Sequence, residues 1–197
     1  MNSRSNREAL LEGALQCLQE KGYAHTTARD IVAASNTNLG AIGYHYGTTE
    51  TLLNAALIEG FERWFREVAD VILELEDANE LERFTRVAAE LPGTFERNRP
   101  LARAFIEALA QAEHSEEIRA ALAESYERAR ENVVALLQAL DGPATVPHSR
   151  VVASLLIAIF DGLLLQWLLD PDRTPTGAEL IQTALQAGSA RSETPEA

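Results

Sequence analysis

The chain of 197 residues contains a single cysteine and no alternating polar and apolar run long enough to predict a β-strand. One cysteine cannot build an internal disulfide framework, and this scarcity fits a reducing cytosol. Cys17 is expected to be a small buried side chain on a helix rather than a nucleophile. The N-terminal stretch MNSRSNREALLEGAL lacks the apolar core and cleavage site of a signal peptide. We therefore expect a cytoplasmic protein without a disulfide scaffold.

Basic residues are also scarce. The sequence has 17 Lys and Arg against 30 Asp and Glu, which gives a formal charge of −13. Residues 1–50 hold four of the basic and five of the acidic residues, so the remaining residues carry a formal charge of −12. A nearly neutral first quarter followed by a strongly acidic remainder indicates two regions with different roles, but it does not by itself indicate nucleic-acid binding.

What the sequence does have is helical periodicity, with hydrophobic residues at 46% of positions. Leu11, Ala14 and Leu18 recur at helical spacing, and Lys21-Gly22 is a typical helix end. The whole pattern predicts helices over about 5–21, a short segment capped by Thr26 or Thr27, 38–45, 49–67 or beyond, 80–96, 100–112, 115–140, 148–169 and 176–188. Residues 191–197 are predicted to be a disordered polar tail.

The apolar stretch at residues 151–169, VVASLLIAIFDGLLLQWLL, is just long enough to span a membrane. Asp161 and Gln166 lie inside it and no basic flank marks an orientation. We expect no membrane span but a helix of a soluble protein, with one face on its own bundle and another on a twin subunit. Asp161-Gly162 marks either a close helix crossing or a polar anchor in a ligand pocket.

Residues 22–53, GYAHTTARDIVAASNTNLGAIGYHYGTTETLL, contain a short helix, a break of about three residues and a second short helix, which is a helix-turn-helix layout. This segment resembles the DNA-binding region of the TetR (tetracycline-repressor-like) family of transcriptional regulators. The elements that match in spacing are Gly22-Tyr23, Thr26-Thr27, Asp30-Ile31, Leu39-Gly40-Ala41-Ile42, Tyr44-His45-Tyr46-Gly47 and Glu50-Leu52-Leu53. A spaced set of this kind is far more specific than a lone motif.

The resemblance implies an all-α protein with an N-terminal helix-turn-helix DNA-binding domain, residues 1–48, and a helical ligand-binding and dimerisation domain, residues 49–190. It further implies a homodimeric repressor of a palindromic DNA operator, released by a small apolar or amphipathic ligand and needing no cofactor. Two positions depart from the family's commonest pattern. Gly43 replaces an aromatic residue, and Thr49 replaces a lysine expected to contact phosphate.

In a helix-turn-helix the second helix enters the major groove and the first crosses the DNA backbone. Leu39 is expected to meet a thymine methyl group, Asn38 a base edge or phosphate, and small residues let the helix approach the groove floor. Hydroxyl, imidazole and helix N-terminal N–H groups suit phosphate. The predicted DNA-binding residues are Thr26, Thr27, Arg29, Asn38, Leu39, Gly40, Gly43, Tyr44, His45, Thr48 and Thr49.

Several of these residues have a structural alternative. Tyr46 is expected to pack in the core and Tyr44 to face DNA. His45 is either a packing residue or a DNA contact. Arg29 either binds DNA or pairs with acidic neighbours. The attraction for DNA is expected to come from Arg4, Arg7, Lys21 and Arg29, doubled by dimerisation.

The second domain holds most of the large apolar side chains, which either line a ligand pocket or form ordinary core. The predicted pocket residues are Trp64, Phe84, Phe105 and Phe160. The predicted dimer interface comprises Leu156, Leu163, Trp167 and Leu180 on the helices 148–169 and 176–188.

Two other classes of function compete with a DNA-binding regulator. The histidines His25, His45, His114 and His148 show no metal-ligand spacing, and no nucleophile-elbow motif is present, so neither a metal site nor an enzyme is expected. The alternative from a third class is a helical interaction module with weak or lost DNA binding, which the low positive charge favours.

Overall fold

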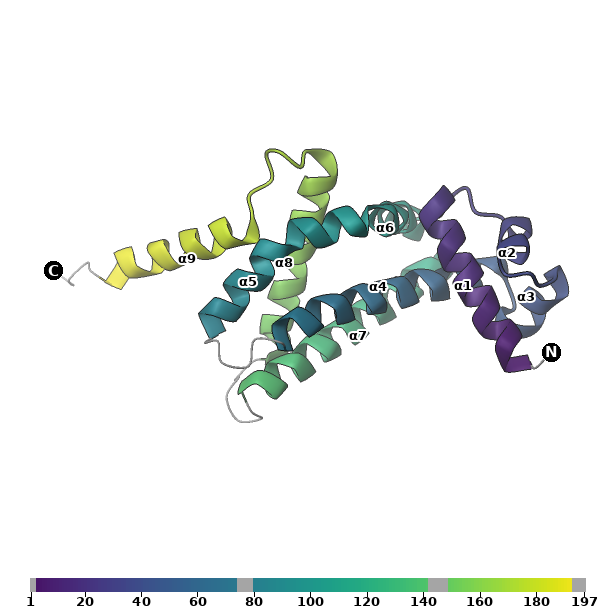
Figure 1. Cartoon of the computed structure of the whole chain (residues 1–197), viewed down its shortest axis with the longest axis horizontal. Helices are drawn as coiled ribbons and strands as arrows, with labels where there is room; N and C mark the ends of the chain where they lie inside the picture. Colours follow the sequence, from purple (N-terminus) through teal and green to yellow (C-terminus); the bar gives the residue numbers. More distant parts are fainter. Residues whose placement is uncertain (1–2, 74–79, 142–148, 193–197) are drawn as a thin grey trace.

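The computed structural model describes residues 3–73, 80–141 and 149–192 of the chain (Figure 1). Within these ranges the chain is all-α, as predicted, and no strand is present. The helices are α1 (Ser3–Lys21), α2 (Ala28–Ala34), α3 (Leu39–Tyr46), α4 (Thr49–Leu73), α5 (Glu80–Arg97), α6 (Arg99–Ala112), α7 (Glu116–Asp141), α8 (Ser149–Leu169) and α9 (Gly177–Ser192). The side chains of some helical residues, Arg4 and Phe84 among them, lie outside the described part.

The helix bounds follow the predicted ones closely, with two differences. The break between α5 and α6 is the single residue Asn98, because Pro100 sits at the start of α6, where its missing N–H has no helical partner to lose. Helix α9 continues to Ser192, two residues into the segment predicted as a disordered tail. Residues 193–197 of that tail lie outside the described residues.

Helices α1, α2 and α3, together with the first half of α4, form a small unit that we call the head (residues 3–60). Its core contains Leu10, Leu18, Ile31 and Leu52, all fully buried. A Cβ on Gly13 would lie 2.8 Å from the Cβ of Ser35, so the glycine allows α1 and α2 to approach closely. The head occupies one end of the molecule (Figure 1).

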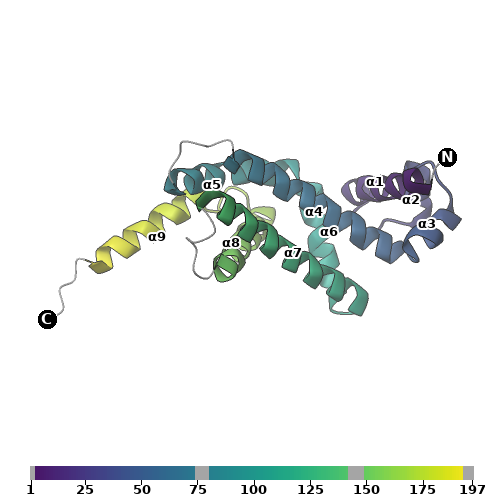
Figure 2. The same ribbon diagram turned by 90° about the horizontal axis from the view of Figure 1, so that it is seen from below.

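The remaining residues, 61–192, form a second helical unit that we call the bundle. Helix α4 runs without interruption from the head into the bundle, where α7 lies along it (Figure 2). Helix α8 packs against α7, and α9 packs against α5 and extends away from the end opposite the head (Figure 1). A Cβ on Gly60 would lie 2.8 Å from a methyl carbon of Leu101 and 2.9 Å from one of Leu15, so α4, α1 and α6 are tightly packed where they meet.

Helix α8 is apolar on two faces, as predicted, but only one of them packs within the chain. Ala153, Leu163, Leu164 and Trp167 are buried. The opposite face is exposed, and by helical spacing it forms one continuous stripe: Val151, Leu155, Ile159, Leu165 and Leu169. By length and composition alone, α8 is the one helix in the described ranges that could cross a membrane.

Candidate DNA interface and ligand cavity

Helix α3 presents an uncharged outer face. Tyr44 is 80% exposed and Leu39 is 54% exposed, whereas Ala41 and Ile42 are buried beneath them. Gly40 lies on the outer face, and Gly43 is exposed with no atom within 4 Å of where its Cβ would be. This division of inward and outward residues is the one predicted from the sequence. It leaves a low, open surface flanked by two protruding side chains.

Short polar contacts fix α3 in place. The side chain of Asn38 accepts a hydrogen bond from the backbone N–H of Ala41 at 3.0 Å and so caps the helix. The hydroxyl of Tyr46 donates to the backbone carbonyl of Arg7 at 2.9 Å, and the Arg7 guanidinium stacks over its ring. Tyr46 therefore belongs to the edge of the core. His45 is half-buried with its ring edge-on to Tyr44, which fits the packing role.

The threonines predicted to bind phosphate divide into two groups. Thr26 is buried, and its hydroxyl donates to the backbone carbonyls of Gly22 and Cys17. The prediction for Thr26 is wrong, because this hydroxyl closes the turn after α1 from the inside. Thr27 caps α2 in a reciprocal pair with Asp30, and Thr48 accepts from the backbone N–H of Thr51 at the start of α4. Both Thr27 and Thr48 remain on the surface, and Thr49 is half-buried.

The basic residues of the head are not equally available. Lys21 pairs with Asp30 at 2.5 Å, and this contact, with those from Thr27, lowers the pKa of Asp30 to about 2. The expectation that Lys21 supplies free positive charge is therefore wrong. Arg29 is exposed and, within the described residues, has no carboxylate at ion-pair distance. The acidic-neighbour alternative for Arg29 thus finds no support. The side chain of Arg4 lies outside the described part.

The bundle contains a partly open cavity of about 410 Å³ between α4, α5, α6, α7, α8 and α9. Trp64, Phe105 and Phe160 line it, as predicted, while the side chain of Phe84 cannot be placed because it lies outside the described residues. Further apolar residues complete the wall, among them Phe61, Phe65, Leu91, Val133, Leu136 and Ile181. The sequence predicted the aromatic content of this wall, with Phe84 on α5 among it, but not the contribution of α9.

The four residues predicted for the dimer interface differ in their placement in the bundle. Leu163 and Trp167 are buried inside their own bundle, where the Trp167 ring contacts Phe95 and lies under the Arg99 guanidinium. Leu156 and Leu180 line the cavity. The prediction is corrected for Leu163 and Trp167, because buried side chains cannot meet a partner subunit, whereas for the half-buried Leu156 and for Leu180, which is 39% exposed, it stays a prediction. Because α8 is apolar nearly all round, periodicity could not tell its inner face from its outer one.

Asp161 is the polar anchor that the sequence left as one of two alternatives. It lines the cavity, and its carboxylate accepts a hydrogen bond from the Tyr126 hydroxyl at 2.7 Å. Burial raises the pKa of Asp161 and is also the main cause that raises the pKa of Tyr126. A Cβ on the neighbouring Gly162 would meet nothing within 4 Å, so this glycine does not mark a close helix crossing within the described part of the chain.

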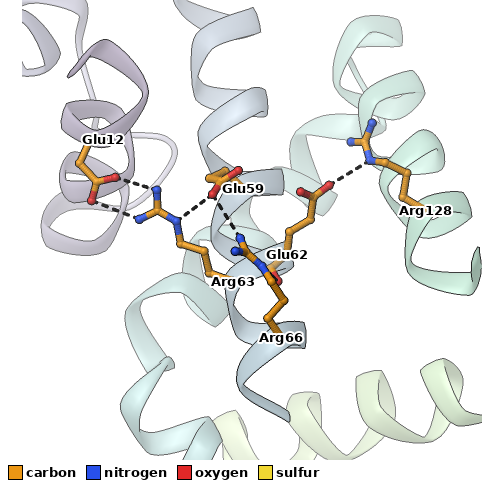
Figure 3. A network of polar contacts seen from close by, with 6 residues as sticks. All are labelled: Glu12, Glu59, Glu62, Arg63, Arg66 and Arg128. Atoms are coloured by element: carbon orange, nitrogen blue, oxygen red, sulfur yellow. Dashed lines mark hydrogen bonds and ion pairs between the residues drawn. The ribbon is translucent and has the colours of Figure 1, made fainter. Parts of the chain in front are cut away.

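Ion pairs connect the head to the wall of the cavity (Figure 3). Arg63 of α4 donates two hydrogen bonds to Glu12 of α1, at 2.8 and 3.2 Å, and a third to Glu59. The residue before Arg63, Glu62, pairs with Arg128 of α7 at 3.2 Å, and both Glu62 and Arg128 line the cavity. Helix α4 therefore makes polar contacts with the head and with the ligand-facing wall through adjacent residues.

An exposed helix-turn-helix at one end of the molecule and an apolar cavity at the other define a DNA-binding regulator with a sensor domain. Residues 10–56 match the family described as bacterial regulatory proteins, tetR family, and residues 80–188 match the BetI-type transcriptional repressor, C-terminal. The chain belongs to the TetR family. It is a regulator and not an enzyme, since members of this family act by binding DNA.

Individual relatives agree with this assignment. The HTH-type transcriptional repressor AcnR of Corynebacterium glutamicum is 36% identical over 66 residues, which is 34% of this chain and 35% of that protein. The chain thus spans about a third of the curated relatives it matches. The crystal structure of the multidrug binding protein EbrR complexed with proflavin has a TM-score of 0.63 and 28% identity, covering 92% of this chain and 98% of that one. A TetR-family member from Streptomyces coelicolor A3 gives 0.62 and 28%, covering 90% and 96%.

Proposed function

We propose that this chain is a cytoplasmic, homodimeric repressor that binds a palindromic operator and is released by a small apolar or amphipathic ligand held in the cavity. The observation that carries the proposal is the course of α4. Its first turn follows directly on α3, and its middle supplies Phe61, Trp64 and Phe65 to the cavity wall. A ligand that favours one packing of α4 therefore changes how α3 is presented to DNA.

The DNA-binding mode follows from the outer face of α3. Tyr44 and Leu39 protrude toward the base edges, and the glycines between them let the helix backbone seat close to the groove floor. Thr27 and Thr48, with the N-termini of α2 and α4, offer neutral donors to phosphate. Asn38 and His45 stay in the proposal as contacts near the backbone, and Arg29 supplies free positive charge. Thr49, where a lysine is common in the family, gives a weaker phosphate grip.

The ligand part of the proposal rests on the wall of the cavity. It is apolar and aromatic, and its volume is within the range of drug-sized sites. The similar protein EbrR was crystallised with proflavin, a flat aromatic molecule, which supports a comparable ligand here. Trp64, Phe105 and Phe160 are the residues we propose to contact it.

A second copy of the chain is proposed to cover the exposed stripe of α8. Val151 is 68% exposed, Leu155 60% and Leu169 79%, which is unusual for an apolar row of this length on a soluble monomer. Ser154, Ala158 and Gly162 lie along the same face and allow another helix to approach closely. Two-fold pairing of this face places one head at each half-site of a palindrome.

The test of DNA binding is a mobility-shift assay with the DNA flanking the protein's own gene and excess non-specific competitor. The wild type is expected to give a specific shift, and Tyr44→Ala to weaken operator binding at least tenfold, because the exposed Tyr44 ring is proposed to contact the base edges. Leu109→Ala on α6, also an exposed apolar residue, is the matched control and keeps full affinity. No shift for the wild type from low to physiological salt would instead favour the interaction-module alternative.

The dimer is tested separately by sedimentation. Leu155→Glu places a charge on each side of the proposed two-fold contact and is expected to give a folded monomer with at least tenfold weaker operator binding. Leu109→Glu introduces the same charge on α6 and leaves the dimer intact. A Leu155→Glu protein that still sediments as a dimer contradicts the proposed interface.

A further inference from the structure

The charges around the cavity do not balance. The charged and titratable residues that line it, within the described chain, are Glu62 of α4, Tyr126 and Arg128 of α7, and Asp161 of α8. Arg128 is paired with two carboxylates, Glu62 at 3.2 Å and Glu124 at 2.8 Å. Asp161 has no Lys, Arg or His at ion-pair distance among the described residues, and its partner is the neutral hydroxyl of Tyr126. The cavity therefore contains one carboxylate that lacks a counter-ion.

The surroundings of this carboxylate are aromatic. Rings from Phe61, Trp64, Phe65, Phe105, Tyr126 and Phe160 line the cavity. The Trp64 and Phe160 rings lie 5.3 Å apart, and the Phe105 and Tyr126 rings 6.2 Å apart. The faces of such rings are electron-rich and attract a positive charge, most strongly where water is absent. Asp161 is half-buried, and a carboxylate partly withdrawn from water without a counter-ion is unfavourable, so a bound cation would offset that penalty.

We propose that the cavity takes an apolar ligand with one positive charge, for which Asp161 is the counter-ion, Tyr126 the residue that orients Asp161, and the aromatic rings the wall. The proposal rests on the proposed function, because it names the ligand class of the same cavity. The further claim is that the cavity excludes anions. A neutral ligand would find no charged partner in it. The basic group already present, Arg128, is neutralised by Glu62 and Glu124 and so offers nothing to an acidic ligand.

A proton linkage follows from the same geometry. Burial raises the pKa of Asp161, so the carboxyl is protonated over a wider pH range than an exposed aspartate. The cation requires the ionised form, so its affinity rises with pH through that raised pKa. Tyr126 stays protonated in this range because its pKa is raised as well, and Arg128 remains charged, paired with Glu62. An uncharged ligand in the same cavity would show no such increase.

The experiment uses the full chain and two ions of nearly equal size and apolarity, tetraphenylphosphonium and tetraphenylborate. Binding is followed by calorimetry and by quenching of tryptophan fluorescence, to which Trp64 in the wall contributes. The cation is expected to bind at least tenfold more tightly than the anion at pH 8. Asp161→Asn should lower cation affinity at least tenfold, because the asparagine still accepts from Tyr126 but carries no charge. Equal affinities for the two ions, binding of neither, or an unchanged Asp161→Asn protein would overturn the proposal.

Two controls separate charge from folding. Asp70→Asn on the exposed part of α4 changes the net charge equally and is expected to leave cation affinity within twofold of wild type. The favourable effect of a protonated Asp161 on stability is complete below about pH 4, the ordinary aspartate pKa, and is lost as pH rises through the raised folded pKa. Asparagine is uncharged at every pH and so retains this stabilisation. At pH 8 the Asp161→Asn protein should therefore melt at or above the wild-type temperature. A lower melting temperature would contradict an unpaired charge at Asp161.

The proposed function is monitored independently. Ligand-free Asp161→Asn protein is expected to shift operator DNA as the wild type does. If the wild type shifts operator DNA but does not prefer the cation, only the proposed ligand class is overturned. Cation preference without any shift of DNA by the wild type overturns the repressor function alone.

Discussion

The head and the bundle are both built of helices, but they differ in how completely their cores are filled. The head is small, yet Leu10, Leu18, Ile31 and Leu52 have no exposed surface, and Thr27 and Asn38 cap its short helices. The bundle is larger and contains a cavity of about 410 Å³ with a carboxylate that has no counter-ion among the residues the structure describes. A surface that reads the shape of DNA needs a fixed framework, whereas a sensor needs unfilled space. The contrast shows where the chain gives up stability for function.

The comparison is tested most strongly by equal truncations in the two regions. Leu18→Ala in the head is expected to lower the free energy of unfolding by about 2–5 kcal/mol, because it opens a hole in a filled core. Leu136→Ala in the cavity wall enlarges an existing space, where the side chain has fewer neighbours, and should lower it by less than about 1.5 kcal/mol. Urea denaturation followed by circular dichroism measures both, and equal losses would show that the bundle is as well filled as the head.

Gly43 tests the outer face of α3. A Cβ there meets nothing, so Gly43→Ala is expected to raise the free energy of unfolding by about 0.5–1 kcal/mol through the higher helix propensity of alanine. The same methyl group is expected to hold the helix away from the groove floor and weaken operator binding. Thermal melts and mobility shifts are needed together. Unchanged DNA affinity would show that Gly43 does not face the groove.

The smallest effect is expected at the contact between the two regions. Glu12→Gln removes the ion pair with Arg63, but both side chains are largely exposed, so the loss should be below about 1 kcal/mol. The Arg63 hydrogen bond lowers the pKa of Glu12. The stabilisation is therefore present above the ordinary glutamate pKa and is lost as pH falls through the lowered one. The melting temperatures of the two proteins should differ more at pH 7 than at pH 3; an equal difference at both would indicate lost packing.

The sequence predicted best where the chemistry is local. A cap at Thr26 or Thr27 follows from short-range hydrogen bonding, and the structure selects Thr27. The expectation that Tyr46 packs inward and Tyr44 outward was also correct, since two residues apart on a helix lie on different faces. The helix-turn-helix therefore needed little information beyond its own residues.

The errors fall where distant segments meet. Lys21 and Asp30 are nine residues apart, and only the turn between α1 and α2 brings them together. Thr26 and Thr27 are chemically identical, and the turn at Gly22, with a φ of +82°, directs Thr26 inward. In α8, Leu163 and Trp167 face inward, while Leu155 and Leu169 face outward, although all four are apolar. Tertiary packing determines which way these side chains point, so the periodicity of the sequence could not predict it.

The charge separation along the chain bears on how this protein searches for its site. Of a formal charge of −13, residues 1–50 contribute −1, so most of the negative charge belongs to residues after the helix-turn-helix. During diffusional encounter the negatively charged duplex repels the acidic bundle but not the nearly neutral head. This difference orients the protein before contact. The same repulsion shortens its stay on random sequence, where phosphate contacts are the main attraction. The acidic bundle thus discourages wrong encounters on a crowded genome while the recognition helix itself remains free of charge.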